Sequence, residues 1–287
     1  MTNLRLDVIG DPIGHSKSPV IHETVLSQLG IPYEYRKVKV EKGSLPDYLD
    51  EVKALGIRGF NLTMPHKTDI LPYLDYIDDE AKLFNSVNTV KVKDGKLFGY
   101  NTDACGMLKA MEDKGFGALG KNVVILGAGG VSSTIALKMA LEGAATITIL
   151  ARTILSAETI SQNVFNNTKK AVKVLPFEKA SFKIALPVCD ILVNATPLGM
   201  NGLDADFEDL DFLKDLKQGA LIYDLIYNPL ETNLLKAAKA LGFATINGLG
   251  MLIYQGLLAD EIFLDQALDF KYLKAKIEDE FKKLNFF

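Results

Sequence analysis

The stretch Asn122-Val123-Val124-Ile125-Leu126-Gly127-Ala128-Gly129-Gly130-Val131-Ser132 decides the fold. Its first five residues form a short apolar run, which is typical of a buried strand in a parallel sheet. Glycines follow at once, and the apolar residues after them recur at helical spacing. The pattern is G-x-G-x-x-S, with serine where a dinucleotide-binding loop usually has its third glycine. Gly127 permits the tight turn, and Gly129 lets the backbone approach a pyrophosphate at the helix N-terminus. The stretch predicts a dinucleotide-binding site, and the alternative is a glycine turn kept only for packing.

The residues at the end of the next predicted strand bear on which dinucleotide is bound. An NAD site usually has a carboxylate about 20 residues after the glycines, to bind the ribose 2′-hydroxyl. Here the sequence reads Ala151-Arg152-Thr153, without an acid. A guanidinium at this place can pair with a 2′-phosphate. Arg152 therefore favours NADP over NAD, unless it is a surface arginine of no consequence.

Strand-like and helix-like patterns alternate on both sides of this loop. Apolar or alternating runs predict strands at 6–9, 33–40, 59–63, 122–126, 145–150, 172–175, 191–193, 221–224 and 244–246. Helical patterns lie between them, for example at 20–29 and 45–55, and a helix at 104–113 is expected to join two such runs. Strands separated by helices predict a parallel sheet of βαβ units. The sequence is thus assigned to the α/β class.

The composition limits the class of protein. A chain of 287 residues is long enough for about two domains. Lys and Arg number 32 against 36 Asp and Glu, which gives a net charge of −4 and argues against non-specific nucleic-acid binding. Cys105 and Cys189 are far apart and outside any metal-like spacing, as expected for reduced thiols. No signal sequence or membrane-spanning run is recognised, so we expect a cytoplasmic protein without a membrane partner.

A predicted hairpin gathers polar side chains. Residues 89–93 and 96–100 flank Asp94-Gly95, a two-residue turn favoured between antiparallel strands. Facing residues then sum to 189, which places Asn88 opposite Asn101, with Asp103 just beyond. Three polar side chains are therefore expected at the open end of one hairpin.

Two loops in the first half are difficult to explain by packing alone. Ser16 and Ser18 follow the first strand, and two hydroxyls at this spacing suit a carboxylate or polyol, although a serine can also cap the next helix. Asn61 and Thr63 point to one face of their strand, and a helix starting at Pro65 would leave Lys67 in its first turn, where the helix dipole disfavours a cation. Lys67 beside Asp103 and amide donors would form a proton-transfer and hydroxyl-binding site.

The remaining polar residues give weaker indications of a chemical role. His15, His22 and His66 are not spaced as metal ligands, and with no acids near them no metal is expected. Gln255 lies in the nearly apolar run 249–258, where a buried amide needs a partner. An amphipathic helix at the end of the chain is interpreted as a surface helix that covers a core.

Eight motifs in order make the chain similar to the shikimate dehydrogenases over essentially its whole length. They are 10–19 with Ser16 and Ser18, Asn61-x-Thr63-x-Pro65-x-Lys67, Ser86-Val87-Asn88-Thr89, Asn101-Thr102-Asp103, Gly127-Ala128-Gly129-Gly130, Asn194-Ala195-Thr196-Pro197, Asp224-x-x-Tyr227-x-Pro229-x-x-Thr232, and 248–252 with Gln255. The resemblance implies reversible reduction of 3-dehydroshikimate by NADPH to shikimate, in the pathway of aromatic amino-acid synthesis.

The resemblance also implies roles for individual residues. Lys67 and Asp103 would be the catalytic pair, with Lys67 exchanging a proton with the reacting oxygen. The residues that would bind substrate are Ser16, Ser18, Asn61, Thr63, Lys67, Asn88, Asp103, Tyr227 and Gln255. The residues that would bind the cofactor are Gly127, Ala128, Gly129, Gly130, Val131, Arg152, Thr153, Thr196, Pro197, Ile226, Gly248 and Met251.

The chain departs from the family pattern around the 2′-phosphate. Members often have Asn-Arg-Thr and then a second basic residue, whereas this chain has Ala151-Arg152-Thr153 and Ser156. NAD is therefore a weaker alternative cofactor, and a quinate/shikimate dehydrogenase with relaxed cofactor use is the alternative function. Relatives that accept quinate often carry threonine at the second serine, so Ser18 favours shikimate.

The distribution of these residues predicts a discontinuous first domain. Residues 1–103 and 248–287 would form the α/β substrate-binding domain, and 104–247 the Rossmann-type NADP-binding domain. The active site is expected in the cleft between them. The expected partner is a small-molecule substrate, and the protein is expected to be a monomer or homodimer.

Overall fold

The computed structural model describes residues 3–284, and its chain divides into two compact units. Unit 1 comprises Met1–Gly106 and Ile253–Phe287, and unit 2 comprises Met107–Leu252. The helices α5 (Asp103–Glu112) and α10 (Leu249–Leu264) contain the two points at which the chain passes from one unit to the other. The predicted boundary at 103 is the first residue of α5, and the predicted boundary at 248 directly precedes α10.

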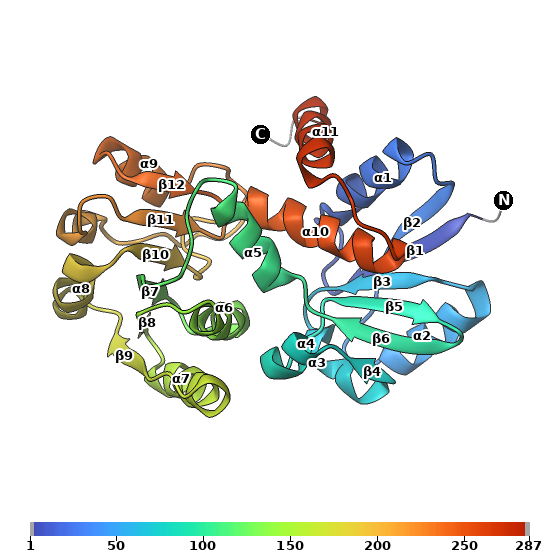
Figure 1. Cartoon of the computed structure of the whole chain (residues 1–287), viewed down its shortest axis with the longest axis horizontal. Helices are drawn as coiled ribbons and strands as arrows, with labels where there is room; N and C mark the ends of the chain where they lie inside the picture. The colour runs from blue at the N-terminus through green and yellow to red at the C-terminus, as the bar shows by residue number, and fades with distance from the viewer. Residues whose placement is uncertain (1–2, 285–287) are drawn as a thin grey trace. The chain divides into compact units, whose positions relative to one another are not determined.

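Unit 1 is built on a mixed six-stranded sheet in the order β2-β1-β3-β5-β6-β4 (Figure 1). Its strands are β1 (Leu4–Gly10), β2 (Tyr33–Lys39), β3 (Gly59–Leu62), β4 (Tyr76–Ile77), β5 (Thr89–Lys93) and β6 (Lys96–Tyr100). Its other helices are α1 (Ser18–Gln28), α2 (Leu45–Leu55), α3 (His66–Asp69), α4 (Asp79–Phe84) and α11 (Phe270–Lys283), with a 3-10 turn at Leu71–Tyr73. β1, β2 and β3 are mutually parallel, whereas β5 runs antiparallel to β3 and β6.

Two cores cover the two faces of this sheet. On one face, Leu6, Val8 and Tyr35 pack with Leu26 of α1 and Phe263 of α10. On the other face, residues of β1 and β3 pack against α2 and the segment that contains α3 and α4. Because alternate side chains of a strand point to opposite faces, both faces of β1 are buried and the strand is apolar at most positions.

The open end of the β5–β6 hairpin has the predicted register. Thr89 lies opposite Tyr100, and the backbone N–H of Asn88 donates to the carbonyl of Tyr100 at 3.0 Å. Asp94 and Gly95 both have positive φ, as the predicted two-residue turn requires. Since β3 is antiparallel to β5, the carboxyl ends of β1, β3 and β6 and the amino end of β5 all lie at one edge of the sheet.

Unit 2 is a fully parallel sheet in the order β12-β11-β10-β7-β8-β9. Its strands are β7 (Asn122–Leu126), β8 (Thr146–Ala151), β9 (Val172–Pro176), β10 (Ile191–Asn194), β11 (Leu221–Asp224) and β12 (Ala244–Ile246). Its remaining helices are α6 (Gly130–Leu141), α7 (Ile154–Thr168), α8 (Lys179–Ala185) and α9 (Asn233–Ala240), with 3-10 turns at Leu186–Val188 and Asp211–Asp215. Numbered from β7, this is the doubly wound order whose switch point lies between β7 and β10. Unit 2 is therefore a Rossmann-type domain.

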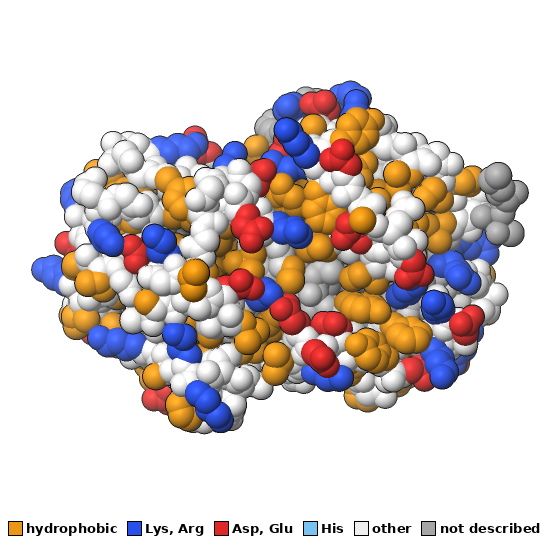
Figure 2. All heavy atoms as spheres, in the orientation of Figure 1, with side chains coloured by type: hydrophobic (Ala, Val, Ile, Leu, Met, Phe, Trp, Pro, Cys, Tyr) orange, Lys and Arg blue, Asp and Glu red, His pale blue; other side chains and the backbone are white. Residues whose placement is uncertain are grey.

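Charged side chains are interspersed on the molecular surface. On the face shown in Figure 2, lysines and arginines alternate with acids and small apolar patches. This mixture agrees with the small net charge of −4. Within residues 3–284, no helix is long and apolar enough to cross a bilayer.

Cys105 and Cys189 are not joined in a disulfide and lie in different surroundings. Cys189 is fully buried in the core of unit 2, whereas Cys105 is partly exposed at the start of α5. Burial raises the pKa of Cys189 from 9.0 to about 12. The folded state thus favours the neutral thiol, whereas the unfolded state can ionise it above pH 9. The stability that depends on a neutral Cys189 is therefore complete below pH 9 and is lost between about pH 9 and 12.

We expect the native protein to react quickly with Ellman's reagent at one thiol, and the unfolded protein at two. The thiolate is the reactive form, and burial withholds Cys189 from both ionisation and reagent. A Cys105→Ser variant is the control, since it should show no fast reaction in the native state. Rapid labelling of both thiols in the native protein would contradict the buried placement of Cys189.

Candidate active site

Lys67 and Asp103 form an ion pair at the sheet edge of unit 1. The Lys67 Nζ lies 2.6 Å from Asp103 Oδ2, and their side chains are 32% and 17% exposed. Lys67 lies in the first turn of α3, as predicted, because Pro65 precedes the helix. The pair is thus held together but remains accessible to a small molecule.

Backbone and side-chain contacts fix α3 beneath Lys67. The Val87 N–H donates to the Lys67 carbonyl at 2.8 Å. The fully buried His66 ring donates from Nε2 to the Val40 carbonyl at 2.6 Å, since a carbonyl oxygen can only accept. Lys67 is therefore attached on one side to the segment before β5 and on the other to the end of β2.

Asn88 holds the second carboxylate oxygen of Asp103. Its Nδ2 donates to Asp103 Oδ1 at 2.9 Å and lies 3.4 Å from Gln255 Oε1. Its Oδ1 accepts from the backbone N–H of Thr102 at 2.9 Å. The Thr102 N–H can only donate and the carboxylate accepts, so these two contacts settle the orientation of the Asn88 amide.

Gln255 reaches the site because α5 and α10 approach closely. A Cβ on Gly106 of α5 would lie 2.7 Å from the Gln255 backbone nitrogen, a distance that no side chain tolerates. Glycine at this position therefore permits the contact between the two helices. The structure thus brings Lys67, Asn88, Asp103 and Gln255 into one cluster of polar groups.

The predicted substrate residues of β3 lie nearby but are more deeply placed. Asn61 is 5% exposed, and its Nδ2 donates to Thr89 Oγ1 at 3.1 Å and lies 3.4 Å from the Asn88 carbonyl. Thr63 follows the end of β3, where its N–H donates to the Ile9 carbonyl at 3.0 Å. Asn61 therefore adjoins Asn88, and Thr63 adjoins the end of β1.

The loop after β1 carries the two predicted serines and a local positive charge. Ser16 Oγ accepts from the Ser18 N–H at 3.3 Å, and Ser18 begins α1. Lys37 of β2 donates to the Gly14 carbonyl at 3.0 Å. The pKa of Lys17 is lowered, mainly by burial and additionally by the charge of Lys37. Two hydroxyls beside two ammonium groups form a suitable place for a carboxylate.

The expectation that no acid lies near the three histidines is wrong for His22. Its Nδ1 lies 2.7 Å from Asp260 Oδ1, and both side chains are fully buried. The two residues are 238 positions apart, so adjacency in sequence could not reveal the contact. In the described part of the chain, three or more His, Cys, Asp or Glu side chains are nowhere grouped to hold a metal ion.

In unit 2, a cavity of about 240 Å³ lies at the switch point of the sheet. Loops after β7, β8 and β10 line it, and its residues are Gly127, Ala128, Gly129, Ala151, Arg152, Thr153, Ser156, Phe177, Ala195, Thr196, Pro197 and Leu198. Seven of the twelve predicted cofactor residues are among them. Gly130 and Val131 begin α6 beside this loop, whereas Ile226, Gly248 and Met251 lie outside the lining.

The glycine loop has the conformation that a phosphate-binding turn requires. Gly127 has φ of 101°, and a Cβ there would lie 2.9 Å from Thr196 Cγ2. A Cβ on Gly129 would meet nothing within 4 Å, so the space above this residue is open. The third residue of the pattern, Ser132, is fully buried in α6, in agreement with a small residue at a close helix–strand contact.

A buried network links three of the predicted cofactor residues, Thr196, Ile226 and Gly248. Asn194 Oδ1 accepts from the Thr196 N–H at 3.1 Å, and Asn194 Nδ2 donates to Asp224 Oδ1 at 3.0 Å. Asp224 also accepts from the Ile226 N–H at 3.1 Å. Burial raises the pKa of Asp224, and the hydrogen bonds oppose that effect. Gly248 donates to the Ile226 carbonyl at 2.9 Å, so the ends of β10, β11 and β12 are linked.

Tyr227 is half-buried in this unit, and burial raises its pKa.

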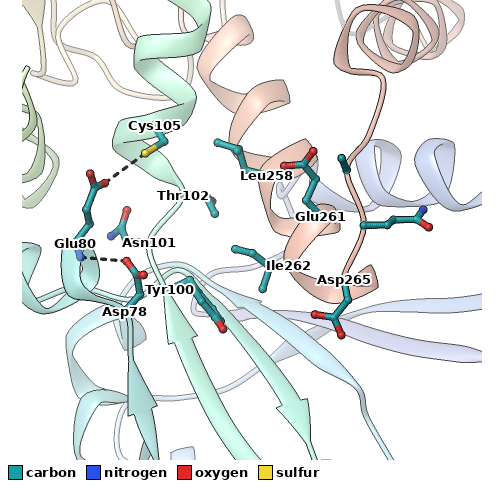
Figure 3. Close-up of a pocket in the computed structure, with 12 residues that line it drawn as sticks. Asp78, Glu80, Tyr100, Asn101, Thr102, Cys105, Leu258, Glu261, Ile262 and Asp265 are labelled. Carbon is teal, nitrogen blue, oxygen red and sulfur yellow. Dashed lines mark hydrogen bonds between the residues drawn. The ribbon is translucent and has the colours of Figure 1, made fainter.

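A second cavity, of about 530 Å³, lies in unit 1 (Figure 3). Its lining does not include Lys67 or Asp103. Four of its lining residues are acids, and each has a partner. Glu80 accepts from Cys105, Asp78 from the Glu80 N–H, Glu261 from the Leu268 N–H, and Asp265 pairs with Lys91. Four carboxylates would repel an anion, so this cavity does not suit an anionic ligand.

Models of two shikimate dehydrogenase domains match the chain, one in each unit. The model for the "Shikimate dehydrogenase substrate binding domain" matches residues 8–90, and the model "Shikimate / quinate 5-dehydrogenase" matches residues 110–203. The "Shikimate dehydrogenase (NADP(+))" of Methanococcus maripaludis is 39% identical over 277 residues, which cover 96% of this chain and 97% of the relative.

Solved structures agree over nearly the whole length. A shikimate dehydrogenase crystallised with NADP⁺ matches with a TM-score of 0.88 and 39% identity, over 97% of this chain and 96% of that one. Shikimate 5-dehydrogenase from Listeria monocytogenes, in complex with shikimate and NAD, matches with a TM-score of 0.88 and 32% identity, over 95% and 96%. The 5-ketofructose reductase of a Gluconobacter species matches with a TM-score of 0.86 and 34% identity, over 97% and 99%. The chain belongs to the shikimate dehydrogenase family of NADP-dependent oxidoreductases.

Proposed function

We propose that this protein catalyses the reversible NADPH-dependent reduction of 3-dehydroshikimate to shikimate, with Lys67 and Asp103 as the catalytic pair. The observation that carries this proposal is the 2.6 Å ion pair, accessible at the sheet edge and fixed by Asn88. The proposed substrate-binding domain is 1–103 with 248–287, and the proposed NADP-binding domain is 104–247.

Lys67 supplies the proton in the reduction direction. As the substrate carbonyl at C3 accepts a hydride, negative charge develops on its oxygen, and a nearby ammonium stabilises that charge and donates the proton. Asp103 holds Lys67 by charge and hydrogen bond, and Asn88 holds Asp103. Held in this orientation, the Asp103 carboxylate can also accept a hydrogen bond from a neighbouring ring hydroxyl of the substrate.

The remaining polar groups of unit 1 bind the substrate. Ser16 and Ser18 bind its carboxylate, assisted by the positive charges of Lys17 and Lys37. Asn61, Thr63, Asn88 and Gln255 bind the ring hydroxyls. Tyr227, which belongs to unit 2, is proposed to act near the carboxylate end.

The lining of the cavity in unit 2 fits NADP. The open space above Gly129 and the N-terminus of α6 suit a pyrophosphate, and Arg152 suits a 2′-phosphate. Thr153, Thr196, Pro197, Ile226, Gly248 and Met251 complete the proposed cofactor site. When bound, the reduced nicotinamide supplies the hydride.

The alternative is a quinate/shikimate dehydrogenase that accepts NAD as well as NADP. It is favoured by one observation, that Arg152 is the single cation in the lining of the cofactor cavity, with Ser156 beside it. Because the chain is also similar to a 5-ketofructose reductase, 5-ketofructose, which has no carboxylate, is a third substrate to be tested.

A substrate and cofactor panel tests the proposal. Shikimate, quinate and 5-ketofructose would each be assayed with the NADP and NAD couples, with the absorbance of reduced nicotinamide as the readout. We expect shikimate with NADP⁺ to give the highest kcat/KM. A preference for quinate with NAD⁺ would establish the alternative, and activity only with 5-ketofructose would reject both.

The proposed chemistry also indicates the partners and the cellular location of the enzyme. Its partners are the small-molecule substrate and the cofactor, and the proposed location is the cytoplasm, where the thiols of Cys105 and Cys189 stay reduced.

A further inference from the structure

A chain of hydrogen bonds runs across the sheet of unit 1 into the catalytic pair. Tyr35 Oη donates to Asn61 Oδ1 at 2.9 Å, Asn61 Nδ2 donates to Thr89 Oγ1 at 3.1 Å, and Thr89 Oγ1 donates to Asn88 Oδ1 at 3.0 Å. Asn88 Nδ2 then donates to Asp103. The chain joins β2, β3 and β5 on one face of the sheet and ends at the active site.

The direction of every bond in this chain follows from its fixed end. The Thr102 N–H makes Asn88 Oδ1 an acceptor, so the Thr89 hydroxyl must donate to it. Thr89 Oγ1 is then an acceptor, and Asn61 must present its Nδ2. Asn61 Oδ1 consequently faces away from Asn88 and needs a donor, which is the Tyr35 hydroxyl.

Among the described residues, the Tyr35 hydroxyl is the donor to Asn61 Oδ1, and both side chains are buried. Tyr35 is 9% exposed and Asn61 is 5% exposed. Without this donor the Asn61 oxygen is buried and unpaired, or the amide turns over and presents oxygen toward Thr89. Either outcome disturbs the amide, because a buried unpaired acceptor is strongly disfavoured.

A buried pair behind Tyr35 holds its ring in place. The His22 ring stacks on the Tyr35 ring with centroids 4.7 Å apart and an interplanar angle of 13°. His22 is itself fixed by Asp260 at 2.7 Å, and both are fully buried. The ring therefore has little freedom to move its hydroxyl away from Asn61.

We infer that Tyr35 is a positioning residue for substrate binding, which acts by fixing the Asn61 amide with its N–H end toward Thr89 and Asn88. This inference rests on the proposed function, in which Asn61 binds a ring hydroxyl. Asp103 keeps its hydrogen bond from Asn88, whose amide the Thr102 N–H also holds, and Lys67 keeps its ion pair with Asp103. Tyr35 therefore influences substrate affinity more than the chemical step.

The Tyr35→Phe variant tests this inference, because it removes the hydroxyl and keeps the ring. KM for shikimate is expected to rise roughly three- to tenfold, the effect of one buried hydrogen bond, while kcat stays within about twofold. The matched control is Tyr48→Phe. Tyr48 is equally buried in unit 1 and donates to Asp7 at 3.0 Å, on the other face of the sheet, so its loss should leave KM unchanged.

A double-variant cycle shows whether Tyr35 acts through Asn61. In an Asn61→Ala background, Tyr35→Phe is expected to cause no further rise in KM. A second route avoids changes at Tyr35 altogether. Thr89→Val removes the acceptor of Asn61 Nδ2 and should raise KM, whereas Thr89→Ser keeps the hydroxyl and should not.

The outcomes separate this inference from the proposed function. A wild-type protein that does not oxidise shikimate removes the proposed function. An active wild type in which Tyr35→Phe behaves like Tyr48→Phe, lowers kcat instead of raising KM, or still raises KM in the Asn61→Ala background removes the inference alone.

Discussion

Replacement of Lys67 by alanine is expected to lower kcat for shikimate oxidation by roughly 10²–10⁴-fold, the usual contribution of a positioned acid–base group. The variant loses both the proton carrier and the cation beside the reacting oxygen. KM for shikimate should change much less, because Asn88, Gln255 and the two serines remain to bind the substrate. Steady-state assays of reduced nicotinamide measure both constants.

A lysine of unit 1 outside the site provides the control for this prediction. Lys82 also pairs with an aspartate, Asp79 at 3.3 Å, but lies on the surface of α4. Lys82→Ala should therefore retain wild-type kcat. Near-normal turnover in Lys67→Ala would exclude Lys67 from the proton transfer.

Substitution of Arg152 by glutamine is expected to raise KM for NADP⁺ by roughly 10–100-fold and to leave KM for NAD⁺ nearly unchanged. A charged hydrogen bond to a phosphate is worth about 1.5–3 kcal/mol, and no second cation lines the described cavity to replace it. NAD lacks the 2′-phosphate, so it gains nothing from the guanidinium. Initial rates with each cofactor at saturating shikimate give the two KM values.

Lys183→Gln is the matched control for the cofactor prediction. Lys183 is exposed and lines the neighbouring cavity of unit 2, which also includes Arg152, but it does not line the cofactor cavity. Its substitution should leave both KM values unchanged. An unaltered ratio of the two KM values in Arg152→Gln would mean that the 2′-phosphate is bound elsewhere.

The features that the sequence could predict are local in the chain. The strand–glycine–helix stretch at 122–132 predicts β7 and α6, since its signals lie within a few residues of one another. The Asp94-Gly95 turn fixes the register of the hairpin, and from that register the meeting of Asn88 and Asp103 follows. Pro65 fixes the start of α3 and so the place of Lys67.

The features that the sequence could not predict depend on the order of strands and on distant contacts. Tyr35 reaches Asn61 across β1, which requires the order β2-β1-β3. Asp260 meets His22 from the far end of the chain. One signal was present, because Asp260 is a carboxylate inside the apolar helix α10, and a buried carboxylate needs a partner. Its partner could be identified only from the packing of α10 on α1.

The most direct test of the central claim is the initial rate at which the purified wild-type protein reduces NADP⁺ with shikimate, compared with Lys67→Ala at the same concentration. We expect saturable, shikimate-dependent formation of NADPH by the wild-type protein and a rate at least about 100-fold lower for the variant. The absence of shikimate-dependent NADPH formation by a folded wild-type protein, or equal rates for the two proteins, would contradict it.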